Sequence, residues 1–170
     1  TGRTTAHLSN AIDDRYVEIE RIHGHAGARS AADSHTAAID RIGQIVRDEK
    51  IACDFECVDG YLVQSPEDSS DLLDQELAAA RRAGLEGVEL VPHPPLPGIM
   101  QRCLRFPDQA QVHPVKYLSG LMHAVLKRGG RIHTATHVTH VEGASMAQIL
   151  TQGGPIVRAN AVVIATNTPI

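Results

Sequence analysis

The feature that most constrains the fold is an unbroken apolar run, AVVIA at residues 161–165, close to the end of this 170-residue chain. Such a run is typical of a strand that is covered on both faces, as in a parallel sheet between helices. Residues 114–127 predict an amphipathic helix that ends at a Gly-Gly pair, and the β-branched segment 131–141 follows at once. We therefore predict a parallel layer that contains 131–141 and 161–165, with an antiparallel excursion over 138–159 between them.

The remainder of the chain alternates between helical and strand patterns. Two amphipathic helices are predicted before residue 50, separated by the glycine-containing break HGHAG at 23–27. The pair Asp59-Gly60 predicts a β-hairpin near residues 54–64. Acidic residues at the start of 65–84, arginines near its end and a final glycine predict a helix. The proline-rich stretch 92–98 predicts a loop that leads into the strand-like segments CLRFP and AQVH.

Charge and composition exclude several classes of protein. The chain has 16 Lys and Arg against 20 Asp and Glu, a net charge of -4, so no basic face for nucleic acid or anionic lipid is expected. No apolar run approaches the roughly 20 residues that span a bilayer, and the N-terminus has no signal-peptide core, so we predict a cytoplasmic protein. The three cysteines lack C-x-x-C spacing and are predicted to be reduced core thiols. No metal site is predicted, because the cluster of His133, His137 and His140 contains no carboxylate or cysteine.

Four segments carry a resemblance to a known family: GRTTAHLSNAIDDRY, AQVHPVKYLSGL, RGGRIHTATHVTHVEG and ANAVVIATNTP. Together they resemble the FAD-dependent oxidoreductases of the D-amino-acid-oxidase-like superfamily, and most closely members that carry a C-terminal Rieske iron–sulfur domain. The resemblance implies a mixed α/β (α+β) fold, with part of an FAD/NAD(P)-binding-type fold and part of an antiparallel substrate-domain sheet. It assigns residues 1–50 and 113–170 to the FAD-binding domain and 51–112 to the substrate domain.

The resemblance implies a parent protein that oxidises a small-molecule amine or amino acid by hydride transfer to FAD. In the family a G-x-G-x-x-G turn binds the FAD pyrophosphate; it would lie upstream of Thr1 and does not occur in this sequence. We therefore expect an internal fragment that binds FAD weakly, is inactive by itself and self-associates through an exposed sheet edge. The alternative is a truncated, non-enzymatic binding or interaction module that has lost the cofactor.

The resemblance also implies which residues contact FAD. The loop at 2–8 would lie against the flavin side and contact the pyrophosphate and ribityl groups, although its residues alone are more typical of a polar helix-capping segment. The main chain of Val138 would meet the adenine, and the turn after 161–165 would close over the dinucleotide. The cofactor-binding residues are thus predicted to be Thr4, Thr5, Ala6, His7, Val138, Ala165, Thr166 and Asn167.

Two residues are candidates for substrate binding. In this family an arginine or tyrosine of the substrate sheet commonly binds a substrate carboxylate, and Arg105 and Tyr61 are the candidates here. Each is also explained as a structural residue on a sheet surface. His113, beside Pro114, is predicted to cap the helix that follows or to lie at the rim of the core, rather than to act near the flavin.

Overall fold

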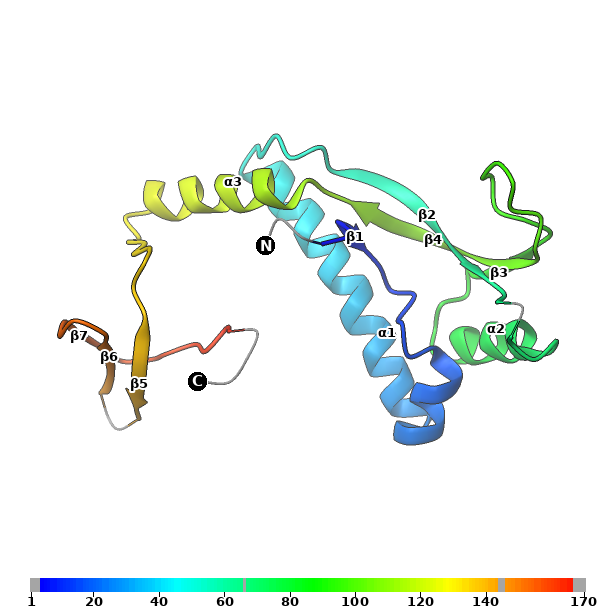
Figure 1. The fold of residues 1–170 in the computed structure, drawn as a ribbon, viewed down its shortest axis with the longest axis horizontal. Coiled ribbons are helices and arrows are strands. Elements are labelled where there is room, and N and C mark those ends of the chain that lie inside the picture. Colours follow the sequence, from blue (N-terminus) through cyan, green and yellow to red (C-terminus); the bar gives the residue numbers. More distant parts are fainter. Residues whose placement is uncertain (1–3, 66, 144–145, 167–170) are drawn as a thin grey trace. The chain divides into compact units, whose positions relative to one another are not determined.

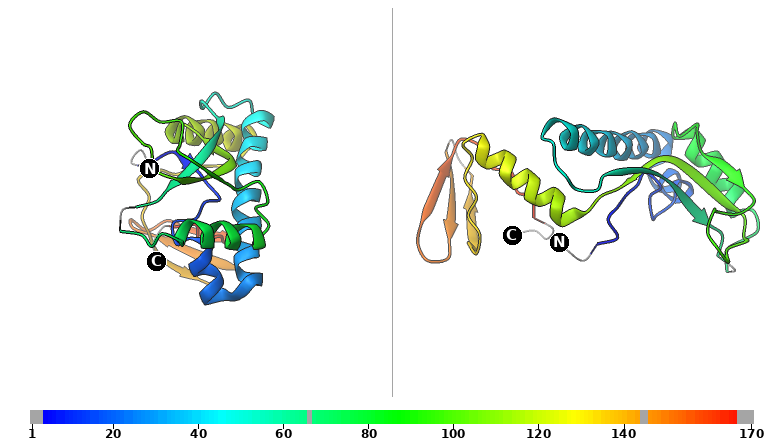
Figure 2. Two further views of the ribbon diagram at one scale, coloured as in Figure 1. Left: turned by 90° about the vertical axis from the view of Figure 1, so that its right-hand side faces the viewer. Right: turned by 90° about the horizontal axis from the view of Figure 1, so that it is seen from above.

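The computed structural model describes residues 4–65, 67–143 and 146–166. It divides into two compact units, residues 1–127 and 128–170, which are described separately. Figures 1 and 2 show their helices and strands in three views. Helices and an antiparallel sheet make up the first unit, and an antiparallel sheet makes up the described part of the second, which together are the mixed architecture that the sequence predicts.

Strand β4 (Cys103–Gln111) organises the sheet of the first unit, because every other strand of that sheet pairs with it. β2 (Glu56–Val63) follows β4 along most of its length. The shorter strands β1 (His7–Leu8) and β3 (Glu89–Val91) pair with the two ends of β4. All of these pairings are antiparallel, so the sheet brings the start of the chain beside residues about a hundred positions later.

Helices α1 (Tyr16–Asp48) and α2 (Leu72–Arg82) pack against each other and against the sheet (Figure 1), where they bury a core with Leu104 and Phe106 of β4. Two helices with a break at 23–27 were predicted where α1 lies, and this prediction is confirmed. The range Tyr16–Asp48 consists of two helical parts joined by a kink at Gly24, whose φ of 69° and ψ of 176° are non-helical. The helix resumes directly after the kink because Ala28 and Ala32 are buried in the same core as Tyr16.

The hairpin predicted near residues 54–64 is wrong, because both halves of this segment pair with the same strand. Val58 lies opposite Gln109 and Gly60 opposite Phe106, so β2 continues through Asp59-Gly60 without a turn, and the bulge falls in β4, where two residues oppose Asp59. Glycine is favoured opposite this bulge because a Cβ at Gly60 would lie 3.1 Å from Cγ of Gln109. The predicted segments CLRFP and AQVH likewise join into the single strand β4.

Several local predictions are confirmed. α2 occupies the predicted helical stretch and has two arginines in its last turn, and the proline-rich stretch forms a loop between β3 and β4. α3 (Pro114–Lys127) begins and ends as predicted. His113 caps it, since the backbone N–H of Lys116 donates to Nδ1 of His113 over 3.4 Å and the N–H of Tyr117 to its carbonyl oxygen over 2.9 Å.

The second unit is a three-stranded antiparallel sheet of β5 (Val138–Glu142), β6 (Ala147–Thr151) and β7 (Ile156–Ala159), which confirms the predicted excursion. The predicted parallel layer is not found among the described residues. Residues 131–137 and 161–166 are irregular, and Val163 is 87% exposed. A strand with two apolar faces needs paired neighbours and cover on both sides, and the described residues of this unit supply neither to 161–166.

Candidate functional site

The loop between β1 and α1 is held by a buried amide network. The side chain of Gln109 is fully buried, and its Oε1 accepts hydrogen bonds from the hydroxyl of Ser9 and the backbone N–H of Asn10, both over 2.8 Å. Its Nε2 donates to Oδ1 of Asn10 over 2.8 Å and to the carbonyl of Pro107 over 2.7 Å. Asn10 Nδ2 in turn donates to Oγ1 of Thr36 on α1. Because these polar atoms are paired with one another, the loop has one well-defined position against the sheet.

The other end of this loop is fixed by a carboxylate from α2. Arg15, the N-cap residue of α1, has a φ of 63° and forms no side-chain cap. Instead Glu76, which is 1% exposed, accepts the backbone N–H groups of Tyr16 and Val17 over 2.8 and 2.9 Å. A carboxylate at a helix N-terminus is stabilised by the orphan N–H groups and the helix dipole. Burial, and then the charge of Glu76, raise the pKa of the Tyr16 hydroxyl, which donates to the carbonyl of Asn10 over 2.6 Å.

A hollow of about 540 Å³ lies beside this loop and opens against β2. Its walls come from β1, from the loop at 9–15, from α1 and from β2. Among the described residues, the lining contains two aspartates and two histidines but no lysine or arginine: Thr5, His7, Ser9, Ala11, Ile12, Asp13, Asp14, His35, Gly60, Tyr61 and Leu62. Its volume falls in the range of small-molecule sites, roughly 300–1,000 Å³.

This hollow brings together residues that the sequence assigned to two different roles. Thr5 and His7 belong to the predicted cofactor loop, and Tyr61 is a predicted substrate residue. Thr4 is exposed beside them, and its hydroxyl accepts the backbone N–H of Ala6 over 3.4 Å. Ala6 has a φ of 63°, in the left-handed region that a residue with a Cβ seldom adopts.

Arg105 lies on the neighbouring strand, directly opposite Tyr61 in the β2–β4 register. Its NH1 is 2.9 Å from Oδ2 of Asp59 and its Nε is 2.8 Å from Oε1 of Glu89. The hydrogen bond to Asp59 is the main reason that the pKa of Arg105 is raised. Burial, and secondarily the charge of Asp59, raise the pKa of the Tyr61 phenol. Tyr61 is therefore a neutral hydroxyl donor at physiological pH, whereas the guanidinium of Arg105 is already bound by two carboxylates.

The remaining predicted cofactor residues belong to the second unit. Val138 begins β5 opposite Thr151 and is half-buried. Ala165 and Thr166 are exposed in the irregular segment after β7. Asn167 lies outside the described residues. Their predicted contacts with the cofactor stay predictions.

Sequence reasoning did not single out several residues of the hollow. Asp13 and Asp14 belong to the segment GRTTAHLSNAIDDRY, which carries the family resemblance, but no role was predicted for them. None was predicted for Ser9 or His35 either. The pair of adjacent aspartates just before a helix was a usable signal, but it is equally typical of helix-capping acids. His35 could not be found from the sequence, because it lies on α1, 26 residues after Ser9. It approaches the loop only in the fold, where its Nδ1 is 3.1 Å from the carbonyl oxygen of Ser9.

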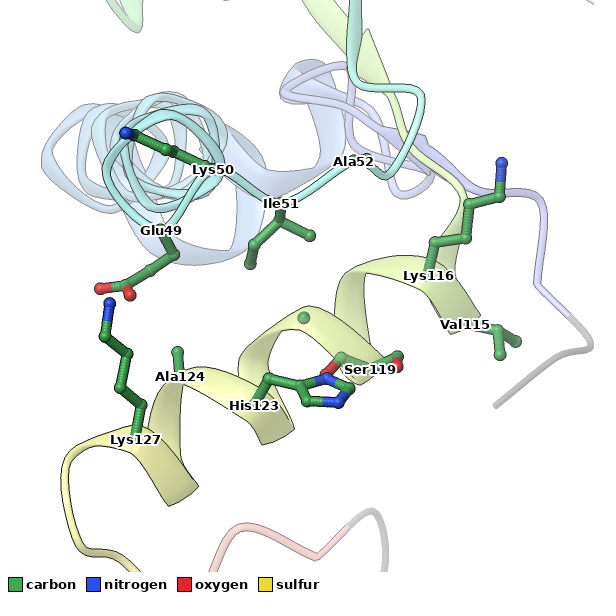
Figure 3. A pocket seen from close by; sticks show the side chains of 11 residues that line it. Glu49, Lys50, Ile51, Ala52, Val115, Lys116, Ser119, His123, Ala124 and Lys127 are labelled. Carbon is green, nitrogen blue, oxygen red and sulfur yellow. The ribbon is translucent and has the colours of Figure 1, made fainter.

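A larger hollow of about 600 Å³ lies between the end of α1 and α3 (Figure 3). Lys116 Nζ is 2.6 Å from Oδ2 of Asp54, and Figure 3 shows Lys127 directed toward Glu49. α3 approaches the segment that follows α1 closely at Gly120, where a Cβ would clash with the side chain of Ile51. None of the predicted site residues lines this hollow. We therefore regard it as a consequence of helix packing.

Metal sites and membrane-spanning helices are the two further features to consider. Within the described ranges, no group of three or more His, Cys, Asp or Glu side chains could hold a metal ion. In the same ranges, no helix has the length and apolarity needed to cross a bilayer.

Comparison with known proteins agrees with the resemblance described above. The family model of FAD dependent oxidoreductases (DAO) matches residues 1–169. The protein YhfW of Bacillus subtilis (strain 168), described as a Rieske 2Fe-2S iron-sulfur protein, is 27% identical over 169 residues, which are 99% of this chain and 33% of YhfW. Subunit A1 of the anaerobic glycerol-3-phosphate dehydrogenase of Haloferax volcanii is 29% identical over 149 residues, or 81% of this chain and 23% of that subunit.

The fold is similar to that of a solved flavoenzyme. The crystal structure of glycine oxidase from Geobacillus kaustophilus matches with a TM-score of 0.71 and 19% sequence identity, over 97% of this chain and 44% of that one. This likeness confirms the predicted fold class. The chain thus spans less than half the length of each of these relatives.

Proposed function

We propose, from the premise that this chain belongs to the FAD-dependent oxidoreductase family, that it forms part of an enzyme that oxidises an amine or amino-acid substrate at the 540 Å³ hollow. FAD is the cofactor of this family. One observation carries the proposal. Thr5 and His7, predicted for the flavin side, and Tyr61, predicted for the substrate side, line the same hollow. A reaction that passes a hydride from substrate to flavin requires such adjacency.

The lining of the hollow fits one part of FAD better than the other. The lining includes the acidic side chains of Asp13 and Asp14, and the part of it that the structure describes has no lysine or arginine. This charge would repel the diphosphate but not the uncharged flavin ring and ribityl chain. Thr5 offers a small hydroxyl that allows close approach, and His7 offers an exposed ring at the adjoining strand. We therefore assign Thr4, Thr5, Ala6 and His7 to the flavin and ribityl end of FAD.

The bound flavin would supply the oxidising power, and the chain's own residues would hold the substrate. The neutral phenol of Tyr61 can donate a hydrogen bond into the hollow, which orients a polar substrate. Arg105 would act as a positioning residue, because its ion pair with Asp59 joins β4 to β2 beside Tyr61. Unit 2 would contribute Val138, Ala165, Thr166 and Asn167 to the dinucleotide.

A phosphorylated alcohol, the substrate class named for the Haloferax volcanii relative, is the main competing candidate. Its phosphate dianion would require cationic partners, typically arginine or lysine. The described lining residues include none, and the guanidinium of the nearby Arg105 is bound by Asp59 and Glu89. An amine is the better match to this charge.

The test uses the full-length gene product loaded with FAD under anaerobic conditions. Addition of amines or amino acids should bleach the visible flavin absorbance, whereas glycerol-3-phosphate should not. Tyr61→Phe should lower kcat/KM about tenfold, the effect of one lost hydrogen bond of about 1.4 kcal/mol, without changing FAD content. Tyr117→Phe removes a hydroxyl away from this hollow and serves as the control. Bleaching by glycerol-3-phosphate alone would contradict the proposal.

A further inference from the structure

The imidazole of His35 on α1 is held in one tautomer by the loop beside the hollow. Its Nδ1 lies 3.1 Å from the backbone carbonyl oxygen of Ser9. A carbonyl oxygen can only accept a hydrogen bond, so this contact places the proton of the neutral ring on Nδ1. The lone pair is then on Nε2, which makes this nitrogen a hydrogen-bond acceptor and a base.

The carbonyl that sets this tautomer is itself fixed. The hydroxyl of Ser9 and the backbone N–H of Asn10 both donate to Oε1 of Gln109 over 2.8 Å, and the side chain of Gln109 is fully buried. Next to His35 on α1, Oγ1 of Thr36 accepts Nδ2 of Asn10 over 3.0 Å. Helix and loop are thus joined on both sides of the ring. A histidine oriented by a third group in this way is the usual arrangement of a general base.

His35 lines the same hollow as Tyr61, the residue proposed to bind substrate. The other titratable residues of the described lining are His7 of β1 and the loop residues Asp13 and Asp14. Of the two histidines, His35 has the backbone contact described above, which sets its tautomer. Burial raises the pKa of the Tyr61 phenol, so this group is a donor near neutral pH and does not accept a proton.

The proposed reaction needs a proton acceptor. An aliphatic amine is bound mainly as its ammonium form near neutral pH, because its pKa is about 10. The nitrogen of an ammonium group has no lone pair, and hydride transfer from the neighbouring carbon needs that lone pair to form a C=N bond. One proton must therefore leave the nitrogen before the C–H bond breaks.

We infer that His35 is the catalytic base of this oxidation and that its Nε2 takes the proton from the substrate ammonium. This inference rests on the proposed function. The N–H bond breaks, its electron pair stays on the amine nitrogen, and the proton binds Nε2. The C–H bond beside nitrogen then breaks, and the hydride passes to FAD as oxidant. The nitrogen lone pair closes the C=N bond of a cationic iminium product, and His35 returns its proton to solvent.

The first test separates a base from a residue that only holds the loop. In His35→Asn the amide nitrogen can replace Nδ1 and donate to the carbonyl of Ser9, but the side chain supplies no base. The full-length, FAD-loaded gene product is mixed anaerobically with glycine, sarcosine, valine, isobutylamine and putrescine, and flavin bleaching is followed. His35→Asn and His35→Ala should both lower kcat/KM about 100-fold near neutral pH. Wild-type kcat/KM in His35→Asn would overturn the inference and leave the proposed function intact.

The pH dependence of the same variants gives a readout that a structural role would not change. The loss in His35→Asn should shrink as the pH approaches about 10, because the free amine has no proton to give up. A loss that stays constant over this range would also overturn the inference. His123→Asn is the matched control, since Nδ1 of His123 likewise lies 2.7 Å from a backbone carbonyl, that of Ser119, away from this hollow. If none of the five compounds bleaches the wild type, the proposed function fails, and the inference with it.

The second test needs no turnover. The full-length, FAD-loaded protein is labelled with nitrogen-15 in its histidines, and the ring signals that are lost in His35→Asn are assigned to His35. Long-range proton–nitrogen correlation spectra then show which ring nitrogen carries the proton. We expect a neutral ring protonated on Nδ1. A neutral ring protonated on Nε2 would overturn the inference whether or not any substrate is oxidised.

Discussion

The two compact units of this chain are fixed in different ways. In residues 1–127, buried polar side chains join elements that are far apart in sequence: Glu76 binds the start of α1, and Gln109 binds the loop that precedes it. In residues 128–170, three strands pair with their immediate sequence neighbours, and Ala147 is the one buried side chain among those described. Long-range polar anchoring occurs where the candidate site lies. The position of the loop at 9–15 therefore depends on long-range contacts that no local sequence pattern encodes.

The largest effect should follow from removing the carboxylate of Glu76. Glu76→Ala leaves two backbone N–H groups of α1 without their charged acceptor in the interior, so we expect a loss of about 3 kcal/mol in the free energy of unfolding. Urea unfolding followed by far-UV circular dichroism measures it. Glu86→Ala, at an exposed loop position, is the control. A loss no greater than that of the control would show that distant anchoring does not distinguish the first unit.

The second effect concerns the amide network. Gln109→Ala removes four hydrogen bonds and leaves Asn10 unsatisfied, so we expect a loss of about 2 to 3 kcal/mol. The loop at 9–15 should also exchange its amide hydrogens faster than in the wild type, as hydrogen exchange would show. Gln44→Ala, exposed on α1, should leave both quantities unchanged. Normal exchange in the loop of Gln109→Ala would mean that other contacts hold it.

A smaller effect is expected where α3 approaches the end of α1. Gly120→Ala would force the side chain of Ile51 to move, at a cost of about 1 to 3 kcal/mol, while alanine favours the helix by about 1 kcal/mol. The net loss should be about 1 kcal/mol. Gly143→Ala, where a Cβ meets no atom within 4 Å, is the control. Stabilisation by Gly120→Ala would show that α3 and the side chain of Ile51 are not in close contact.

The smallest effect tests the second unit. Val163 is 87% exposed, so Val163→Asp should change the stability of β5–β7 by no more than about 0.5 kcal/mol. Ala147→Asp introduces the same carboxylate at a buried position and should cost about 2 kcal/mol or more. Hydrogen exchange of the strand amides reports both. A large loss for Val163→Asp would instead support the buried strand that the sequence predicts over 161–165.

Local signals predicted much of the architecture. Capping and glycine patterns located α2 and α3, and alternation located the strands of the second unit. The Asp59-Gly60 pair misled because its turn preference is local, and only the pairing with β4 shows that the strand continues through it. The predicted break at Gly24 is present, and Ala28 after it is buried in the same core as Tyr16 before it. Periodicity therefore identified elements, while their extent depended on tertiary contacts.

The candidate site was predictable in part and for a different reason. Thr5, His7 and Tyr61 were named from a family resemblance, and the structure adds that they line one hollow. Asp13 and Asp14 were visible in the sequence, but only the fold shows that they line the hollow. The occupation of Arg105 by Asp59 and Glu89 likewise depends on strand register, which a single sequence does not specify.

The contact between Glu76 and the first turn of α1 has a consequence for folding order. The amides of Tyr16 and Val17 gain their acceptor only when α2 has docked, although about sixty residues separate the partners in sequence. The opening turn of the longest helix should therefore become protected late and together with α2, while its middle can form earlier from local bonds. The loop at 9–15, which lines the hollow and leads into this turn, would then be the last part of the unit to become ordered and the first to open.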